Sequence, residues 1–187
     1  MLKVARSPIA IVLHGTTSAG KSSLAKALQS NSKTPVFHIS MDAFACMANR
    51  ADMRSEVELD QAFKLHCQNL QTTLQTVSES HFDIVLDLVL RDEPAFVACL
   101  NALSSRKTFV IGVHCPLEIL EQRERTRQDR AIGMAREQFG HATYDREYSM
   151  RLDTSTVTAE QGAQLIREFV ESQSNAGGSS VQLVQSR

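Results

Sequence analysis

One motif in the sequence has the residue types and spacing of a phosphate-binding site. Residues 15–22 read Gly-Thr-Thr-Ser-Ala-Gly-Lys-Ser and match the pattern G-x-x-x-x-G-K-[ST]. Small residues let backbone N–H groups converge on a β-phosphate, Lys21 adds a positive charge, and the Ser22 hydroxyl is a magnesium ligand. The alternative is a glycine-rich turn that binds nothing, but an apolar strand pattern precedes the motif and a helical pattern follows it, as a phosphate-binding loop requires. We therefore expect ATP to be bound by Gly15, Thr16, Thr17, Ser18, Ala19, Gly20, Lys21, Ser22 and Ser23.

The rest of the sequence narrows the class of nucleotide-binding protein. It contains neither Asn-Lys-x-Asp nor Asp-x-x-Gly, the guanine-specificity and switch elements of small GTPases. A second glycine-rich ATPase signature is also missing, which disfavours a motor protein. The remaining prediction is a small phosphotransferase.

Two aspartates are candidates for the chemistry beside the phosphates. Asp42 follows the second apolar strand and Asp87 lies within the third. Because parallel strands bring their carboxyl ends to one edge of a sheet, both carboxylates can face the loop. We expect Asp42 to accept or orient the proton of an acceptor hydroxyl, and Asp87 to join Ser22 at magnesium, directly or through water. The alternatives are a helix N-cap for Asp42 and a hydrogen-bond acceptor in the core for Asp87.

Three arginines are candidates for a closing lid. Arg123, Arg127 and Arg130 have i, i+4 and i+7 spacing, so a helix would carry them on one face. A migrating phosphoryl group spreads negative charge over its oxygens, which positive charge can stabilise when the site closes. We expect a lid over about residues 123–140, with Arg127 and Arg130 acting with Lys21 in catalysis. The alternative is a solvated helix face, because acidic residues are interleaved with the arginines.

The pattern of apolar residues predicts the elements that position these groups. The expected strands are 9–13, 36–39, 84–90, 108–113 and 150–152, and the expected helices are 21–29, 57–78, 93–103, 116–127 and 158–171. Continuous apolar strands that alternate with helices indicate a parallel sheet covered on both faces. We expect a three-layer α/β fold with a five-stranded parallel sheet. One domain would span residues 1–171, followed by a flexible tail over 172–187.

Composition limits the partners. The chain has 187 residues, enough for one domain, and a formal net charge of −1. A near-neutral chain lacks the positive field that holds nucleic acid or an anionic membrane, and no apolar run is long enough to span one. Four scattered cysteines, Cys46, Cys67, Cys99 and Cys115, indicate reduced thiols and a cytoplasmic location. The expected partner is a small hydroxylated acceptor, and homo-oligomerisation stays open.

Taken together, residues 13–23, the Ser-Met-Asp-Ala-Phe element at 40–44, Asp87 and the stretch 123–134 resemble the chloramphenicol phosphotransferase-like family. The resemblance covers about residues 9–170 and is most specific at Arg-x-Asp-Arg-x-x-Gly-Met, residues 127–134, joined to His141 and to residues 153–155. It implies a P-loop kinase fold and an ATP-dependent O-phosphotransferase that uses magnesium, with Asp42 as the base. It also assigns the lid role to Arg127 and Arg130. The nucleotide would then also be contacted by Arg123, Asp153 and Thr154.

The acceptor is left open by two departures from the family. Residues 45–56 form a much shorter segment than the antibiotic-covering part of the family's named enzyme, and Ser149 stands where the family tends to carry Asp. A small metabolite or an antibiotic is the first expectation, the latter with a role in antibiotic resistance. The alternatives are a nucleotide or nucleotide-sugar kinase, like nucleoside monophosphate kinases or zeta toxins, and a non-enzymatic ATP-binding module.

Overall fold

The computed structural model describes residues 6–48, 53–89, 92–126, 132–139 and 146–175. Its strands are β1 Ile9–His14, β2 Val36–Ser40, β3 Asp83–Leu88, β4 Lys107–His114 and β5 Met150–Asp153. Its helices are α1 Lys21–Ser30, α2 Met41–Ala45, α3 Glu56–Ser78, α4 Glu93–Ala102, α5 Leu117–Thr126, α6 Met134–Phe139 and α7 Ala159–Asn175. Within the described ranges, none of these helices has both the length and the hydropathy needed to cross a bilayer.

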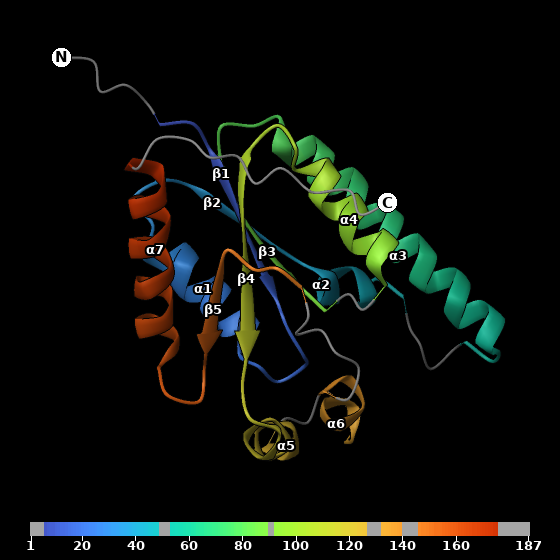
Figure 1. Cartoon of the computed structure of the whole chain (residues 1–187). Coiled ribbons are helices and arrows are strands. Elements are labelled where there is room, and N and C mark those ends of the chain that lie inside the picture. The colour runs from blue at the N-terminus through green and yellow to red at the C-terminus, as the bar shows by residue number, and fades with distance from the viewer. Residues whose placement is uncertain (1–5, 49–52, 90–91, 127–131, 140–145, 176–187) are drawn as a thin grey trace.

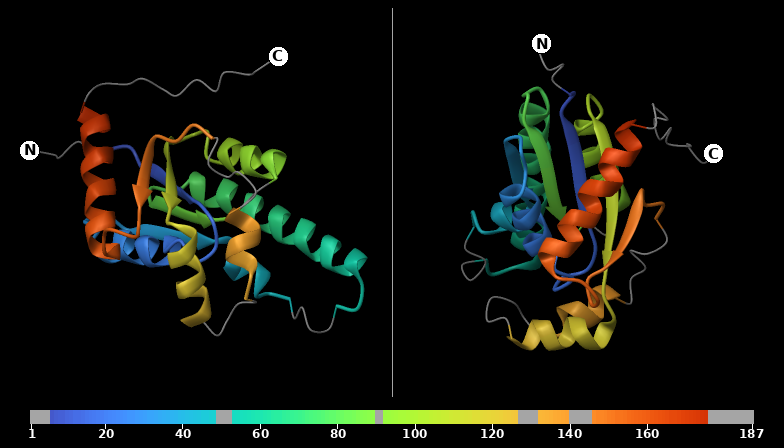
Figure 2. Two further views of the ribbon diagram at one scale, coloured as in Figure 1. Left: turned by 60° about the horizontal axis from the view of Figure 1, so that its bottom comes forward. Right: turned by 90° about the vertical axis from the view of Figure 1, so that its left-hand side faces the viewer.

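The strands form one parallel sheet in the order β2-β3-β1-β4-β5. Figures 1 and 2 show α1 and α7 on one face of this sheet and α3 and α4 on the other. Helices α5 and α6 lie beyond the edge at which the strands end (Figure 1). This arrangement confirms the predicted three-layer fold and brings the segments after β1, β2 and β3 to one edge.

The central strand β1 explains why the sheet needs helices on both faces. All six of its residues are buried. Ile9, Ile11 and Leu13 belong to the core that includes residues of α1 and α7, whereas Ala10 and Val12 belong to the core that includes residues of α3 and α4. Successive side chains of a strand point to opposite faces, so an uninterrupted apolar run requires cover on both sides.

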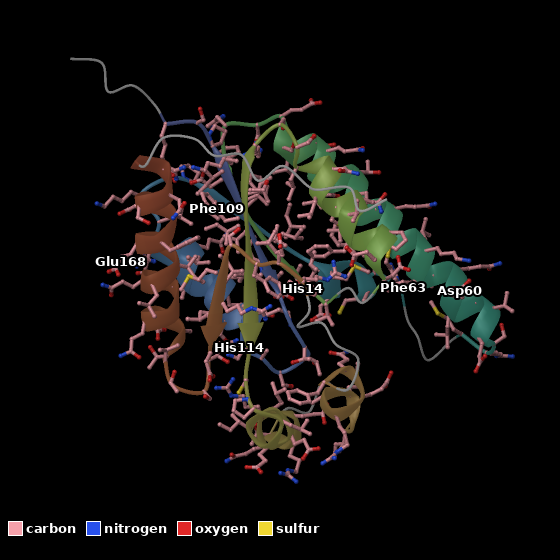
Figure 3. The ribbon with its side chains drawn as sticks, viewed as in Figure 1. His14, Asp60, Phe63, Phe109, His114 and Glu168 are labelled. Atoms are coloured by element: carbon pink, nitrogen blue, oxygen red, sulfur yellow. The ribbon has the colours of Figure 1, made fainter. Side chains whose placement is uncertain are left out.

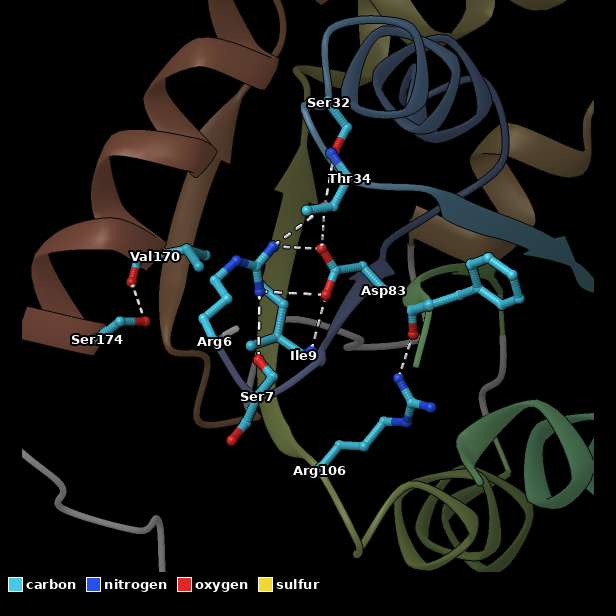
Figure 4. Close-up of polar contacts among 10 residues, drawn as sticks. Arg6, Ser7, Ile9, Ser32, Thr34, Asp83, Arg106, Val170 and Ser174 are labelled. Atoms are coloured by element: carbon cyan, nitrogen blue, oxygen red, sulfur yellow. Dashed lines mark hydrogen bonds and ion pairs between the residues drawn. The ribbon is translucent and has the colours of Figure 1, made fainter. Parts of the chain in front are cut away.

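Charged side chains stabilise the opposite edge of the sheet, where the strands begin (Figure 4). The Asp83 carboxylate accepts hydrogen bonds from the Ile9 backbone N–H at 2.9 Å and the Thr34 hydroxyl at 2.8 Å, and it pairs with Arg6. Arg106 donates from Nε to the Ser78 carbonyl at 2.8 Å and from its other nitrogens to nearby carbonyls. These contacts stabilise strand and helix ends far from the phosphate-binding motif.

The start of α2 corrects the alternative role of Asp42 as a helix cap. The N-cap residue is Ser40, and Met41 is the first residue of the helix. Asp42 lies in the first turn, one position further along. Helix capping therefore does not account for this carboxylate.

Two other elements differ from the sequence-based expectation. Helix α6 was not predicted, because six residues are too few to show a helical period. Helix α7 continues to Asn175, whereas the expected end was Glu171 with a flexible tail after it. The Ser174 hydroxyl donates to the Val170 carbonyl at 2.8 Å within this extension (Figure 4). The first part of the expected tail is therefore helical, and residues 176–187 lie outside the described residues.

Candidate active site

The phosphate-binding loop joins β1 to α1 at the edge where the strands end. Its backbone turns at Ser18 and Gly20, whose φ angles are 60° and 86°. A positive φ is unstrained for glycine, whereas the serine adopts it at a cost that is common in functional loops. A Cβ atom at Gly15 would lie 2.0 Å from the carbonyl oxygen of Val113 in β4. Gly20 therefore allows the turn, and Gly15 allows the loop to pass close to β4.

The Lys21 side chain folds over this loop. Its Nζ donates to the Thr16 carbonyl at 2.8 Å, and the residue is only 6% exposed. A buried ammonium requires partners that compensate for lost hydration. A positive charge is therefore held at the centre of the loop, where the motif predicts a phosphate contact.

Ser22 and Asp87 meet beside the loop, as the sequence predicted. The Ser22 hydroxyl donates to Asp87 Oδ2 at 2.6 Å, and His38 Nε2 lies 3.7 Å from the same oxygen. Burial raises the pKa of this carboxyl, but the neighbouring His38, Lys21 and Ser22 outweigh burial and hold the pKa below its usual value. The carboxyl is therefore ionised at neutral pH.

This pair has the chemistry of a magnesium site. Mg²⁺ prefers oxygen ligands and is usually held by one or two protein groups together with substrate phosphates and water. The Ser22 hydroxyl and the Asp87 carboxylate supply such oxygens next to the loop. The described residues contain no cluster of three or more His, Cys, Asp or Glu side chains that could hold a metal by themselves. The residues present fit a magnesium ion that is shared with a nucleotide.

A pocket of about 590 Å³ opens beside the loop and contains the predicted base. Asp42 lines this pocket together with Lys21 and Ser22. The carboxylate expected to act on the acceptor and the groups expected to hold the phosphates therefore share one cavity. The lining residues are Thr17, Ser18, Gly20, Lys21, Ser22, Ser23, Leu24, Lys26, Asp42, Arg123, Thr126, Thr154, Val157, Thr158 and Ala159.

Two of the three remaining nucleotide-binding candidates meet at this pocket. Arg123 donates to the Thr154 hydroxyl at 3.1 Å and to the Thr154 carbonyl at 2.8 Å, and the Thr154 hydroxyl donates to the Ala19 carbonyl at 2.9 Å. These bonds connect α5, the end of β5 and the loop. Asp153 is not among the residues that line the pocket. Its carboxylate accepts from the hydroxyl and the N–H of Ser155, and these contacts lower its pKa. Asp153 orders the turn after β5.

The predicted arginine lid is placed only in part. Arg123 lies on α5, which ends at Thr126. Arg127 and Arg130 lie outside the described residues, and so does His141. The lid over residues 123–140 and the roles of these two arginines stay predictions.

Two polar residues that the sequence did not single out attach α6 to the site. Glu124 is 1% exposed, and its carboxylate accepts from the N–H groups of Gly133 and Ala135, both at 2.8 Å. Gln138 Oε1 accepts from the Thr17 N–H of the phosphate-binding loop at 2.6 Å. The alternative of a solvated helix face, for which the interleaved acidic residues include Glu124, does not hold for Glu124 itself. No local signal could have revealed either contact, because the chemistry of Glu and Gln on a short helix is equally suited to solvent.

His14 is the last residue of β1 and directly precedes the loop. Figure 3 shows His14 and His114 near the ends of the neighbouring strands β1 and β4. His14 is fully buried, and its Nδ1 lies 2.8 Å from the Tyr148 hydroxyl. The Tyr148 ring packs so tightly on Gly112 that a Cβ there would lie 2.7 Å from it. His14 therefore packs in the core directly before the loop, with its Nδ1 in a hydrogen bond.

The fold and this constellation define a P-loop kinase, and comparison with known proteins identifies its family. The model of the family described as chloramphenicol phosphotransferase-like protein matches residues 9–171. The chain belongs to this family and is a phosphotransferase of the kinase type. A Mycobacterium tuberculosis protein named as an O-phosphotransferase is 29% identical over 184 residues, which cover 87% of this chain and 80% of that protein.

Solved structures of kinases share the fold at much lower identity. An unliganded sugar kinase from Janibacter sp. HTCC2649 has a TM-score of 0.64 and 12% identity, over 92% of this chain and 99% of the other. The Mycobacterium tuberculosis APS kinase CysC, in complex with AMPPNP and APS, has a TM-score of 0.64 and 14% identity, over 88% of this chain and 98% of the other. These similarities support the fold alone.

Proposed function

We propose that this protein transfers the γ-phosphoryl group of ATP, with Mg²⁺, to a hydroxyl group of a small molecule. The observation that carries this proposal is the shared pocket, in which Asp42 lies with Lys21 and Ser22. A carboxylate beside phosphate-binding groups is the arrangement needed to bring a hydroxyl acceptor to a phosphoryl donor.

Each group of the pocket has a role in this reaction. The loop N–H groups and Lys21 bind the phosphates, and Ser22 with Asp87 holds magnesium, which neutralises charge on the phosphates when it is bound. The acceptor oxygen forms a bond to the γ-phosphorus while the bond to the bridging oxygen breaks and ADP leaves. Asp42 accepts the proton of the acceptor hydroxyl.

The nucleotide base is assigned to the part of the pocket between α5 and the turn after β5. Arg123 and Thr154 fix this wall through their two hydrogen bonds. Arg127 and Arg130 complete the positive charge around the migrating phosphoryl group. The kinase domain would run from the N-terminal region to the end of α7.

The acceptor is proposed to be a small hydroxylated metabolite or an antibiotic. The short segment over residues 45–56 argues for an acceptor pocket unlike that of the family's named enzyme. An antibiotic acceptor would give the protein a role in resistance. All four cysteines are free, which supports a reducing, cytoplasmic location.

A screen for acceptor-dependent ADP release tests the proposal. Purified protein with ATP and Mg²⁺ is incubated with hydroxylated antibiotics, sugars, nucleosides and nucleotides, and phosphorylated products are identified by mass spectrometry. We expect one acceptor class to release ADP, and Lys21→Ala to abolish the release. ATP binding without any acceptor-dependent ADP release, and without an effect of Asp42→Asn, would instead indicate a binding module.

A further inference from the structure

His38 is a partly buried histidine, and one of its ring nitrogens is unsatisfied next to the carboxylate assigned to magnesium. Its Nε2 is shielded from solvent and has no hydrogen-bond partner among the described residues. Asp87 Oδ2 lies 3.7 Å from this nitrogen, beyond the range of about 2.7 to 3.2 Å for such bonds. A buried polar atom without a partner is unfavourable, so its presence at this place needs a reason.

The register between β2 and β3 determines that His38 lies near Asp87. His38 of β2 lies opposite Val85 of β3, two residues before Asp87. Residues two apart on a strand point to the same face, so His38 and Asp87 are diagonal neighbours on one face of the sheet. Ser22 reaches the same carboxylate from α1.

Both described contacts of the Asp87 carboxylate fall on Oδ2, from Ser22 and from His38. The Ser22 hydroxyl is within hydrogen-bond distance of this oxygen, whereas His38 Nε2 is just outside it, so a single donor holds the carboxylate among the described residues. A second donor on the same oxygen would fix the plane of the carboxylate and leave its other oxygen directed at a cation.

We propose that His38 is a positioning residue for the magnesium carboxylate, with Nε2–H donating to Asp87 Oδ2 in the nucleotide complex. This role rests on the proposed function, since Asp87 matters as a metal ligand only there. A shift of about 0.5 Å brings the two atoms into hydrogen-bond range. The Ser22 hydroxyl can donate to Asp87 while its oxygen binds the cation, and a second donor from His38 adds a constraint that this single hydrogen bond does not supply.

The test measures metal affinity directly. Free Mn²⁺ is followed by electron paramagnetic resonance as Mn²⁺ is titrated into wild-type protein with ADP, and into the variants His38→Phe, His38→Asn and His38→Gln. The glutamine amide nitrogen reaches about as far as Nε2, whereas the asparagine amide does not. We expect Mn²⁺ affinity to fall about tenfold in His38→Phe and His38→Asn and to stay within about twofold in His38→Gln.

Two controls separate positioning from folding. His66 is a buried histidine that, like His38, has a ring nitrogen without a partner among the described residues, and His66→Phe should leave Mn²⁺ affinity unchanged. ADP affinity measured without metal should be equal in all variants. If His38→Phe does not fold, the matched pair His38→Asn and His38→Gln decides.

Three outcomes would overturn the role of His38. They are unchanged Mn²⁺ affinity in His38→Asn, equal losses in His38→Asn and His38→Gln, and a parallel loss of metal-free ADP binding. Wild-type protein that binds ADP without any response to Mn²⁺ or Mg²⁺ would contradict the proposed function itself. Metal-dependent ADP binding that His38→Phe leaves intact would contradict only His38.

Discussion

Strand β3 carries two buried aspartates, four residues apart, whose surroundings differ. Asp83 at its start is 7% exposed and accepts from the Ile9 N–H and the Thr34 hydroxyl while it pairs with Arg6. Asp87 near its end is 4% exposed and accepts one hydrogen bond, from Ser22.

We interpret the difference as one between a carboxylate with a structural role and one for which we propose a functional role. At the edge where the strands begin, the protein itself satisfies the charge of Asp83. At the edge where the strands end, the site leaves Asp87 the capacity to bind a cation. Residue type and burial are therefore poor guides to function, whereas the completeness of the hydrogen bonding is informative.

The largest expected effect lies at the functional edge, in Asp42→Asn. The amide keeps the size of the side chain but cannot accept the proton of the acceptor hydroxyl, so turnover should fall roughly 10² to 10⁴-fold. The melting temperature and the affinity for ATP should match the wild type. Steady-state kinetics on the identified acceptor, together with calorimetry of ATP binding, measures these quantities. Wild-type turnover would transfer the role of base away from Asp42.

The next largest effects are expected from two single substitutions in β3, Asp83→Asn and Asp87→Asn. Asp83→Asn should lower the free energy of unfolding by about 1.5 to 3 kcal/mol, because it weakens charge-assisted hydrogen bonds, and should leave turnover nearly unchanged. Asp87→Asn should lower turnover and magnesium affinity by about tenfold or more, with the smaller change in stability. Urea denaturation and magnesium-dependent kinetics on both variants give the comparison. Equal effects of Asp83→Asn and Asp87→Asn on turnover would contradict the different roles assigned to the two aspartates.

A smaller effect is expected from pH. The pKa of Asp87 is held below its usual value in the folded protein, so its charge stabilises the fold above pH 4, where the unfolded chain would also be ionised. This contribution is lost as pH falls through the lower pKa of the folded state. The difference in melting temperature between the wild type and Asp87→Asn should therefore persist at pH 5 and shrink below about pH 4. A difference that disappears between pH 7 and pH 5 would contradict the assigned direction.

The smallest effect concerns Cys99, a buried residue of α4 that lies at neither of these two edges. Burial raises the pKa of this thiol to about 12. An unfolded thiol titrates near pH 8.5, so stability should decline as pH rises above about 9, where only the unfolded chain loses the proton. At pH 9 a thiol reagent should label the exposed Cys46 and leave Cys99 unmodified, as peptide mass spectrometry can establish. Equal labelling rates would show that the interior opens readily.

Much of the site was predictable from local patterns. The spacing of Gly15, Gly20, Lys21 and Ser22 is contiguous, and a strand before it with a helix after it determines the loop geometry. The placement of Asp87 near Ser22 was also predicted, since parallel strands end at one edge, but their direct hydrogen bond was not.

The remaining contacts depend on segments that are distant in the sequence. Gln138 and Thr17 are 121 residues apart, and neither position carries a motif. A solvated helix face was the alternative considered for the segment that contains Glu124, yet Glu124 is buried and binds the start of α6. Such contacts follow from the packing of α5 and α6 beyond the sheet, which no local period encodes.

The sequence by itself determined the class of chemistry, the parallel sheet and the identity of the loop, because these depend on contiguous residues and on the periods of strands and helices. Only the tertiary structure decided the strand order, the shared pocket of Asp42 and Lys21, and the different surroundings of Asp83 and Asp87. The reason is physical: a hydrogen bond is satisfied or left incomplete by whichever groups the packed chain brings within about 3 Å, and that distance is set by the whole fold.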